Sequence, residues 1–154
     1  MITLVPALIL VGLDQLTKYL ARTRLLLGES VTLCPGFFNL THVRNTGAVW
    51  GTLQHQNAWL ALFSLIALAL IAIFYHRADL RRAHKLALGL MLGGVIGNLI
   101  DRIRLGWVVD FLDFYWRGWH WPTFNLADAA ISVGVVVYMI SVWHGERVAT
   151  PAKG

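Results

Sequence analysis

The chain has few of the residues on which soluble metalloenzymes and disulfide-rich domains depend. It contains one cysteine, Cys34, in 154 residues, which excludes an internal disulfide and a multi-cysteine metal site. Its six histidines show neither HxxxH nor HExxH spacing, so we expect no metal site and no other cofactor. Charged residues make up 14% of the chain, against about 25% in a typical soluble domain.

The scarcity of charge accompanies a strongly apolar composition. Hydrophobic residues make up 57% of the chain and the mean hydropathy is +0.61, which indicates an integral membrane protein. The net charge is +5, but the 13 Lys and Arg residues are scattered beside apolar runs and form no basic stripe with base-stacking aromatics. Nucleic acid is therefore not an expected partner.

Four apolar segments are long enough to cross a bilayer, which takes about 20 helical residues. The first lacks a cationic leading region and an A-x-A-like cleavage site, so we expect a retained helix and not a cleaved signal peptide. We predict one integral membrane domain over residues 1–154, an all-α protein whose four transmembrane helices cover about 2–21, 58–75, 86–103 and 126–143.

The segments between these helices suggest an orientation. Residues 76–85 hold four Lys or Arg side chains and are expected to be cytoplasmic, which leaves 22–57 and 104–125 on the outer face. Residues 30–52 alternate β-formers with turn residues and predict a small β-sheet there. Residues 104–125 are crowded with Trp, Phe and Tyr, most of which we interpret as an aromatic belt at the lipid headgroups.

Glycines mark one face of the third predicted helix. Gly89, Gly93 and Gly97 recur every fourth residue and predict close packing against another helix. Gly94 lies beside this stripe and is a candidate for close approach of a substrate backbone.

Polar residues gather where the third and fourth spans end and begin. Four of the eight acidic residues fall within residues 98–128. Ionisable groups near hydrocarbon are costly unless paired or hydrated, so such a cluster usually marks a functional site. Its members are Asn98, Asp101, Arg102, Asp110, Asp113, Asn125 and Asp128.

Each acid of this cluster also has a structural interpretation. Asp101 shares a helix face with Asn98 and Arg102, and it fits an ion pair at the helix end as well as a catalytic acid. Asp128 lies three residues after Asn125, so the two predict a capping box, although a helix N-terminus also stabilises an ionised catalytic carboxylate.

Asp110 and Asp14 occupy apolar surroundings. Asp110 interrupts the apolar run 107–112, and desolvation there would raise its pKa and suit a group that holds a proton. Asp14 has Lys18 one turn later, and we expect a buried ion pair that fixes the first helix.

The chemistry that this cluster allows is peptide hydrolysis by two carboxylates, of which one stays protonated while the other activates water. The main alternative is a proton-coupled small-molecule transporter, which predicts acids in the middle of helices and short loops. Here the acids lie near one face and the outer segments exceed 20 residues. A non-enzymatic membrane assembly subunit would not explain why these polar residues converge.

Five sequence blocks resemble those of the signal peptidase II family, in the family's order. The blocks are Asp14–Lys18, Arg44–Ala48, Gly93–Arg102, Val108–Phe111 and Phe124–Asp128. The resemblance implies a membrane aspartic endopeptidase of the bacterial cytoplasmic membrane, with its active site toward the outer face. Such an enzyme removes signal peptides from prolipoproteins, cutting before a cysteine that carries diacylglyceryl.

The resemblance also implies roles for individual residues. It places the catalytic pair at Asp110 and Asp128, a choice between Asp110 and Asp101 that the residues alone do not make. It implies that an outer sheet cradles the substrate and that the partners are the lipid-modified prolipoprotein and membrane lipids. We separately expect a monomer without a cofactor. The supporting polar residues would be Asn45, Asn98, Arg102 and Asn125, and Val49–Trp50 depart mildly from the family's pattern.

Overall fold

The computed structural model describes residues 2–47, 52–54, 56–77 and 82–149. Two parts of the sequence interpretation fall outside these residues. They are the middle of the predicted cytoplasmic loop, 78–81, and the departure from the family pattern at Val49–Trp50.

Within the described residues, four helices are long and apolar enough to cross a membrane, which confirms the predicted fold class. Each continues past at least one of its predicted ends. The helices are α1 (Leu4–Arg24), α2 (Asn57–Arg77), α3 (Arg82–Leu105) and α4 (Leu126–Ala149).

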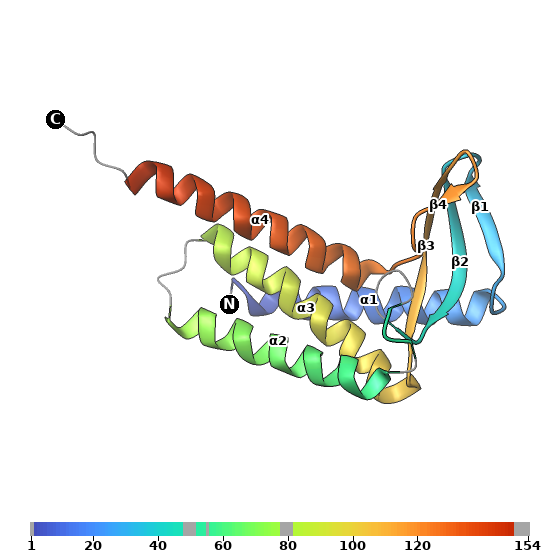
Figure 1. Ribbon diagram of the computed structural model, residues 1–154, viewed down its shortest axis with the longest axis horizontal. Coiled ribbons are helices and arrows are strands. Elements are labelled where there is room, and N and C mark those ends of the chain that lie inside the picture. Colours follow the sequence, from blue (N-terminus) through green and yellow to red (C-terminus); the bar gives the residue numbers. More distant parts are fainter. Residues whose placement is uncertain (1, 48–51, 55, 78–81, 150–154) are drawn as a thin grey trace.

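Helix α3 is the centre of the bundle and packs against the other three helices (Figure 1). The glycine stripe explains its close approach to α1: a Cβ at Gly89 would lie 2.7 Å from the Thr3 carbonyl oxygen, and one at Gly97 would lie 2.5 Å from Asp14 Oδ2. Gly94 faces α4, where a Cβ would lie 2.5 Å from the Ala127 carbonyl oxygen. The suggestion that Gly94 admits a substrate backbone is therefore wrong, because α4 already occupies that space.

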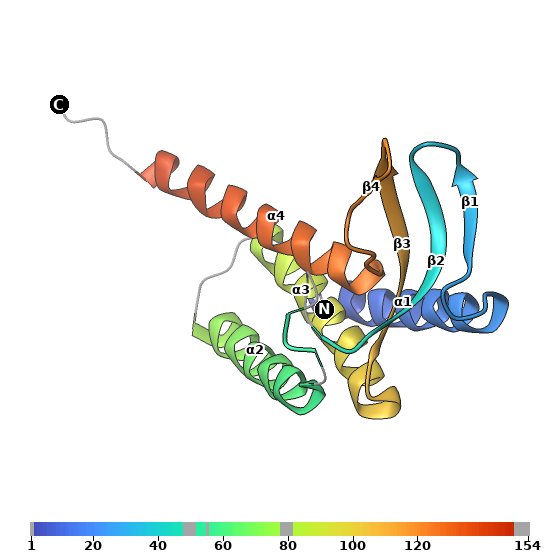
Figure 2. The same ribbon diagram turned by 45° about the vertical axis from the view of Figure 1, so that its right-hand side comes forward.

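An antiparallel sheet lies at one end of the bundle, beside the C-terminal part of α1 (Figures 1 and 2). Its order is β1-β2-β3-β4, so the hairpin that follows α1 pairs with the segment that follows α3. The first two strands confirm the prediction for residues 30–52. The strands are β1 (Ser30–Cys34), β2 (Phe38–Asn45), β3 (Val108–Trp116) and β4 (Trp119–His120).

The sequence did not predict β3. Its aromatic residues were interpreted as part of a headgroup belt, but Phe114 packs within the sheet region, with ring centroids 4.6 Å from Phe38 and 5.8 Å from Phe124. Trp116, Trp119 and Trp121, near the tip, are the large aromatic side chains of this segment that remain exposed. The segment is a strand because it pairs with β2, which lies far away in the sequence, and with Phe124 just before α4.

Candidate active site

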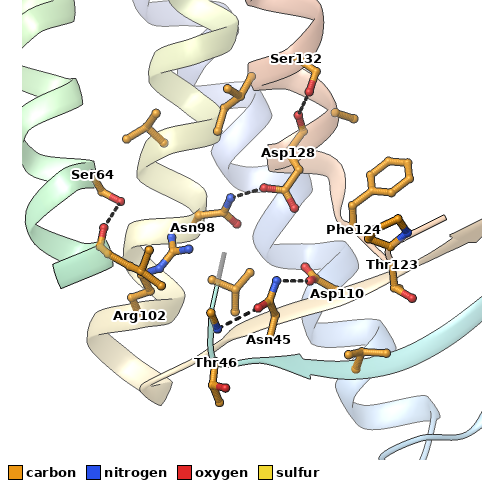
Figure 3. Close-up of a pocket in the computed structure, with 18 of the residues that line it drawn as sticks. Asn45, Thr46, Ser64, Asn98, Arg102, Asp110, Thr123, Phe124, Asp128 and Ser132 are labelled. Atoms are coloured by element: carbon orange, nitrogen blue, oxygen red, sulfur yellow. Dashed lines mark hydrogen bonds between the residues drawn. The ribbon is translucent and has the colours of Figure 1, made fainter. Parts of the chain in front are cut away.

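A pocket of about 1150 Å³ lies where the sheet meets the bundle. Strands β2 and β3 and helices α2, α3 and α4 all contribute to its lining. Figure 3 shows the carboxylates of Asp110 and Asp128 directed toward the same space. Of the residues that the sequence analysis proposed for catalysis or support, the pocket is lined by Asn45, Asn98, Arg102, Asp110 and Asp128.

The register between β2 and β3 determines the position of Asp110. Val43 of β2 pairs with Asp110, and Asn45 pairs with Val108, so Asn45 lies diagonally across from Asp110 on the same face. Asn45 Nδ2 donates a 2.8 Å hydrogen bond to Asp110 Oδ2. The Asp110 side chain is only 1% exposed, so this bond is made away from bulk water.

The backbone after β4 places Asn125. Phe124 exchanges hydrogen bonds with Leu112 of β3, which fixes the start of α4 against the strand. Asn125, which is fully buried, then donates a 2.7 Å hydrogen bond to Asp110 Oδ1. Each Asp110 oxygen accepts one of the two amide bonds, which leaves a second acceptor position for the shared proton, water or substrate.

The predicted capping box at the start of α4 is confirmed. The Asp128 N–H donates to Asn125 Oδ1 at 3.0 Å, and the Asn125 N–H donates to Asp128 Oδ2 at 3.3 Å. The other carboxylate oxygen, Asp128 Oδ1, accepts a 2.7 Å hydrogen bond from Asn98 Nδ2. Capping therefore orients this carboxylate without removing it from the pocket.

The three asparagine side chains can adopt one orientation each, because a group that can only donate holds each amide oxygen. Asn45 Oδ1 accepts from the Gly47 N–H at 3.0 Å, and Asn125 Oδ1 accepts from the Asp128 N–H. Asn98 Oδ1 accepts from Lys18 Nζ at 2.9 Å. With their oxygens occupied in this way, the three NH₂ groups donate toward the carboxylates.

Arg102 lies one turn after Asn98 on α3 and lines the pocket. Figure 3 shows its guanidinium group pointing into the same space as the two carboxylates. Its charge interacts most strongly with that of Asp128 and next with that of Asp110. Arg102 therefore compensates part of the negative charge that the acid pair brings into the pocket.

A second polar cluster lies behind the pocket. The ion pair predicted between Asp14 and Lys18 is present at 2.9 Å, and Lys18 Nζ also lies 3.3 Å from Asp101 Oδ2. Asp101 accepts the Val109 N–H at 3.0 Å, so it anchors β3 from behind. Of the two interpretations of Asp101, the ion pair is present in the structure, and its partner is Lys18 of α1.

Gln15 belongs to this second cluster and was missed as an individual residue, although it falls in a matching sequence block. Its Nε2 lies 3.1 Å from both the Gly97 carbonyl oxygen and Asp101 Oδ1. The available signals were its place in that block and its position next to Asp14.

The environment of Asp110 favours its protonated form. Burial raises the pKa of Asp110, and the negative charge of Asp128 raises it further. Hydrogen bonds from Asn45 and Asn125 oppose these effects, and the resulting pKa is about 7. The pocket thus contains two carboxylates, one of which retains a proton near neutral pH.

Asp113 belongs to neither cluster. It lies three residues beyond Asp110 in β3, on the opposite face of the sheet. The sequence analysis had placed both residues in one polar cluster. Asp113 Oδ1 is 2.7 Å from His120 Nδ1, and Asn39 and Thr41 donate to Oδ2 at 3.1 Å. Burial alone would raise the pKa of Asp113, but these three contacts together lower it. Asp113 therefore ties β2 to the β3–β4 hairpin.

The chain is similar over most of its length to known proteins. The family described as "Signal peptidase (SPase) II" matches residues 6–144. The lipoprotein signal peptidase of Symbiobacterium thermophilum is 42% identical over 153 residues, covering 97% of this chain and 99% of that protein. The lipoprotein signal peptidase of Syntrophotalea carbinolica is 44% identical over 148 residues, covering 93% and 91%.

Two solved structures are also similar, both described as bacterial membrane enzymes determined by the in meso method. The first has a TM-score of 0.88 at 32% identity and covers 97% of this chain and 92% of the other. The second has a TM-score of 0.79 at 33% identity and covers 90% of each chain.

Proposed function

The chain belongs to the signal peptidase II family of aspartic peptidases, and we propose that Asp110 and Asp128 are the two carboxylates with which it cleaves its substrate. It is a multi-pass membrane protein of bacteria. The observation that carries the assignment is that both carboxylates line one pocket and are held there by oriented asparagine amides.

The proposed reaction needs no nucleophilic side chain. Ionised Asp128 removes a proton from a water molecule, and the resulting hydroxide attacks the scissile carbonyl carbon. Protonated Asp110 donates to the carbonyl oxygen and stabilises the tetrahedral intermediate. The proton taken from water then passes from Asp128 to the departing nitrogen as the C–N bond breaks. The carbonyl re-forms and the proton that it received returns to Asp110, which restores the acid pair.

The supporting residues act on charge and orientation. Asn45 and Asn125 hold the two oxygens of Asp110, and Asn98 holds one oxygen of Asp128. Arg102 compensates the negative charge that develops as the carbonyl oxygen becomes an oxyanion.

The substrate we propose is a prolipoprotein, cut just before a cysteine that carries diacylglyceryl. The lining that α2 and α4 contribute beyond the carboxylates is mostly apolar, with Ser64 and Ser132 as its hydroxyl groups. Such a lining suits acyl chains held beside a scissile peptide. We further propose that the pocket lies at the outer face of the bacterial cytoplasmic membrane. We also propose that the chain acts as a monomer.

The proposal is tested with purified Asp110→Asn and Asp128→Asn variants and a diacylglyceryl-modified precursor peptide. Each variant should lose on the order of 10³-fold or more in kcat because each removes a proton donor or acceptor. Asp113→Asn is the matched control, since Asp113 is an acid of the same strand on the opposite face and should remain active. Near-normal turnover by a folded Asp110 or Asp128 variant would refute the assignment.

A further inference from the structure

We propose that Lys18 is a positioning residue that sets the orientation of the Asn98 amide and thereby aims its NH₂ group at Asp128. The inference deepens the proposed function and rests on it. It goes beyond the ion pairs with Asp14 and Asp101, which by themselves would only stabilise α1 and join it to α3.

The geometry of Asn98 carries the inference. Its Oδ1 accepts from Lys18 Nζ at 2.9 Å and from Asn125 Nδ2 at 3.2 Å, while its Nδ2 donates to Asp128 Oδ1 at 2.7 Å. An ammonium group has only donors, so it can face the amide oxygen but never the NH₂ group. If the Asn98 amide were flipped, its NH₂ group would face the charged Lys18 ammonium group and its oxygen would face the Asp128 carboxylate. Both contacts would be repulsive.

Lys18 differs from the donors that hold the other two asparagines. The oxygens of Asn45 and Asn125 are held by backbone N–H groups, which no substitution at those donor positions removes without proline. The oxygen of Asn98 is held by two side chains, Asn125 at the start of α4 and Lys18 of α1, 80 residues away in the sequence, and of these two Lys18 makes the shorter bond and carries the charge. The carboxylate at the start of α4 is thus aligned through α3 by a residue of α1.

The position of Lys18 is itself fixed. Its side chain is 3% exposed, and it lies 2.9 Å from Asp14 Oδ2 and 3.3 Å from Asp101 Oδ2. Asp14 in turn accepts the Ala127 N–H at 3.0 Å, in the first turn of α4. Two carboxylates and one amide oxygen thus accept from the ammonium group, which matches its three N–H donors.

The experiment compares four variants of the full-length enzyme in lipid, each measured for kcat, KM, pH profile and thermal stability. Lys18→Met removes the donor to Asn98. The double variant Lys18→Met, Asp101→Asn removes the same donor but restores the formal charge of the cluster, so it remains informative if the single variant folds poorly. Asp101→Asn alone keeps the Lys18–Asn98 bond, and Arg22→Met removes an exposed cation one turn further along α1.

Both variants that lack Lys18 should lose on the order of 100-fold in kcat, with KM changed less than about threefold, because an oriented donor to the reacting carboxylate is lost. Asp101→Asn and Arg22→Met should keep kcat per folded molecule within about threefold. The charged groups facing Asp110 are Asp128, Lys18 and Arg102. In Lys18→Met alone, loss of the ammonium charge should raise the pKa of Asp110 and move the basic limb of the pH profile upward.

Two results would overturn the inference. One is near-normal kcat in either folded variant that lacks Lys18. The other is an equal loss of kcat in Asp101→Asn, which would show that Lys18 acts only through the ion pairs. Failure of the proposed function is distinguishable, because Asp110→Asn and Asp128→Asn would then turn over substrate whatever the behaviour of Lys18.

Discussion

At the residue scale, Asp110 and Asp128 differ in what surrounds them. Asp110 lies almost fully buried in a strand between two amide donors, whereas Asp128 is half-buried in the first turn of α4. Two like charges that share a pocket resist simultaneous ionisation, so their protons are lost as a pair in separate steps. The difference in surroundings makes Asp110 the member that retains the proton longer.

The rate of cleavage should therefore depend on pH with a bell shape. The pKa of Asp110 is about 7, and its protonated form supplies the proton donor, so activity should fall as pH rises through that value. At acid pH both carboxylates become protonated and the base is lost, so activity should fall again. The measurement is kcat/KM across pH with a lipidated peptide, and a rate that stays constant between about pH 6 and about pH 9 would contradict the protonation scheme.

At the scale of helices and strands, hydropathy and alternation predicted α1 to α4 and the β1–β2 hairpin. Strand β3 could not be predicted in this way, because both of its faces are buried at Val108, Val109, Asp110 and Phe111. The sequence there therefore does not alternate between apolar and polar residues. Its burial depends on β2, which lies more than 60 residues earlier, and on Phe124. Single-sequence patterns do not contain such long-range pairing.

The lack of long-range information in the sequence also limited the prediction of the site. The polar residues were visible in the sequence, but Asp101 and Asp110 were equivalent candidates until their neighbours were known. Lys18 and the Val109 N–H occupy Asp101 Oδ2, whereas Asp110 lines the pocket. The family resemblance made the choice before the geometry did.

Helix packing predicts the effect of adding one methyl group. Gly94→Ala would place a Cβ 2.5 Å from the Ala127 carbonyl oxygen and 2.7 Å from Ile131 Cγ1, which forces α3 and α4 apart. We expect a loss of about 1–3 kcal/mol in stability and reduced turnover, because these helices carry Asn98 and Asp128. Gly12→Ala is the matched control, since nothing lies within 4 Å of its added Cβ. Equal thermal stability of the two variants would contradict this description of the packing.

At the scale of the whole molecule, the pocket reaches from the polar residues to the apolar surfaces of α2 and α4. Its lining there includes Leu60, Phe63 and Ala67 of α2, and Ile131 and Val133 of α4. Figure 2 shows these two helices as separate arms on either side of α3. A substrate whose lipid lies in this space would hold its peptide bond in register with the carboxylates.

Cleavage should accordingly depend on the lipid of the substrate. Removing the diacylglyceryl group from a precursor peptide should lower kcat/KM by at least about 100-fold, because anchoring supplies orientation that the free peptide lacks. Both peptides are compared at equal concentration in the same detergent or lipid. Comparable efficiency on the unmodified peptide would show that the apolar part of the pocket serves another purpose.

The reaction should not depend on a metal ion. The part of the chain that the structure describes contains no group of three His, Cys, Asp or Glu side chains able to hold one. Incubation with EDTA should leave the rate of the wild-type enzyme within experimental error. A rate abolished by chelation and restored by zinc would be incompatible with hydrolysis by two aspartates.

The most direct test of the central claim is a crystal structure with a peptide analogue that carries a hydroxyl group in place of the scissile carbonyl. Such an analogue resembles the tetrahedral intermediate. The account predicts that the hydroxyl oxygen lies within hydrogen-bonding distance, about 2.5–3.0 Å, of a carboxylate oxygen of Asp110 and of one of Asp128. A hydroxyl bound away from either carboxylate would contradict the two-aspartate mechanism.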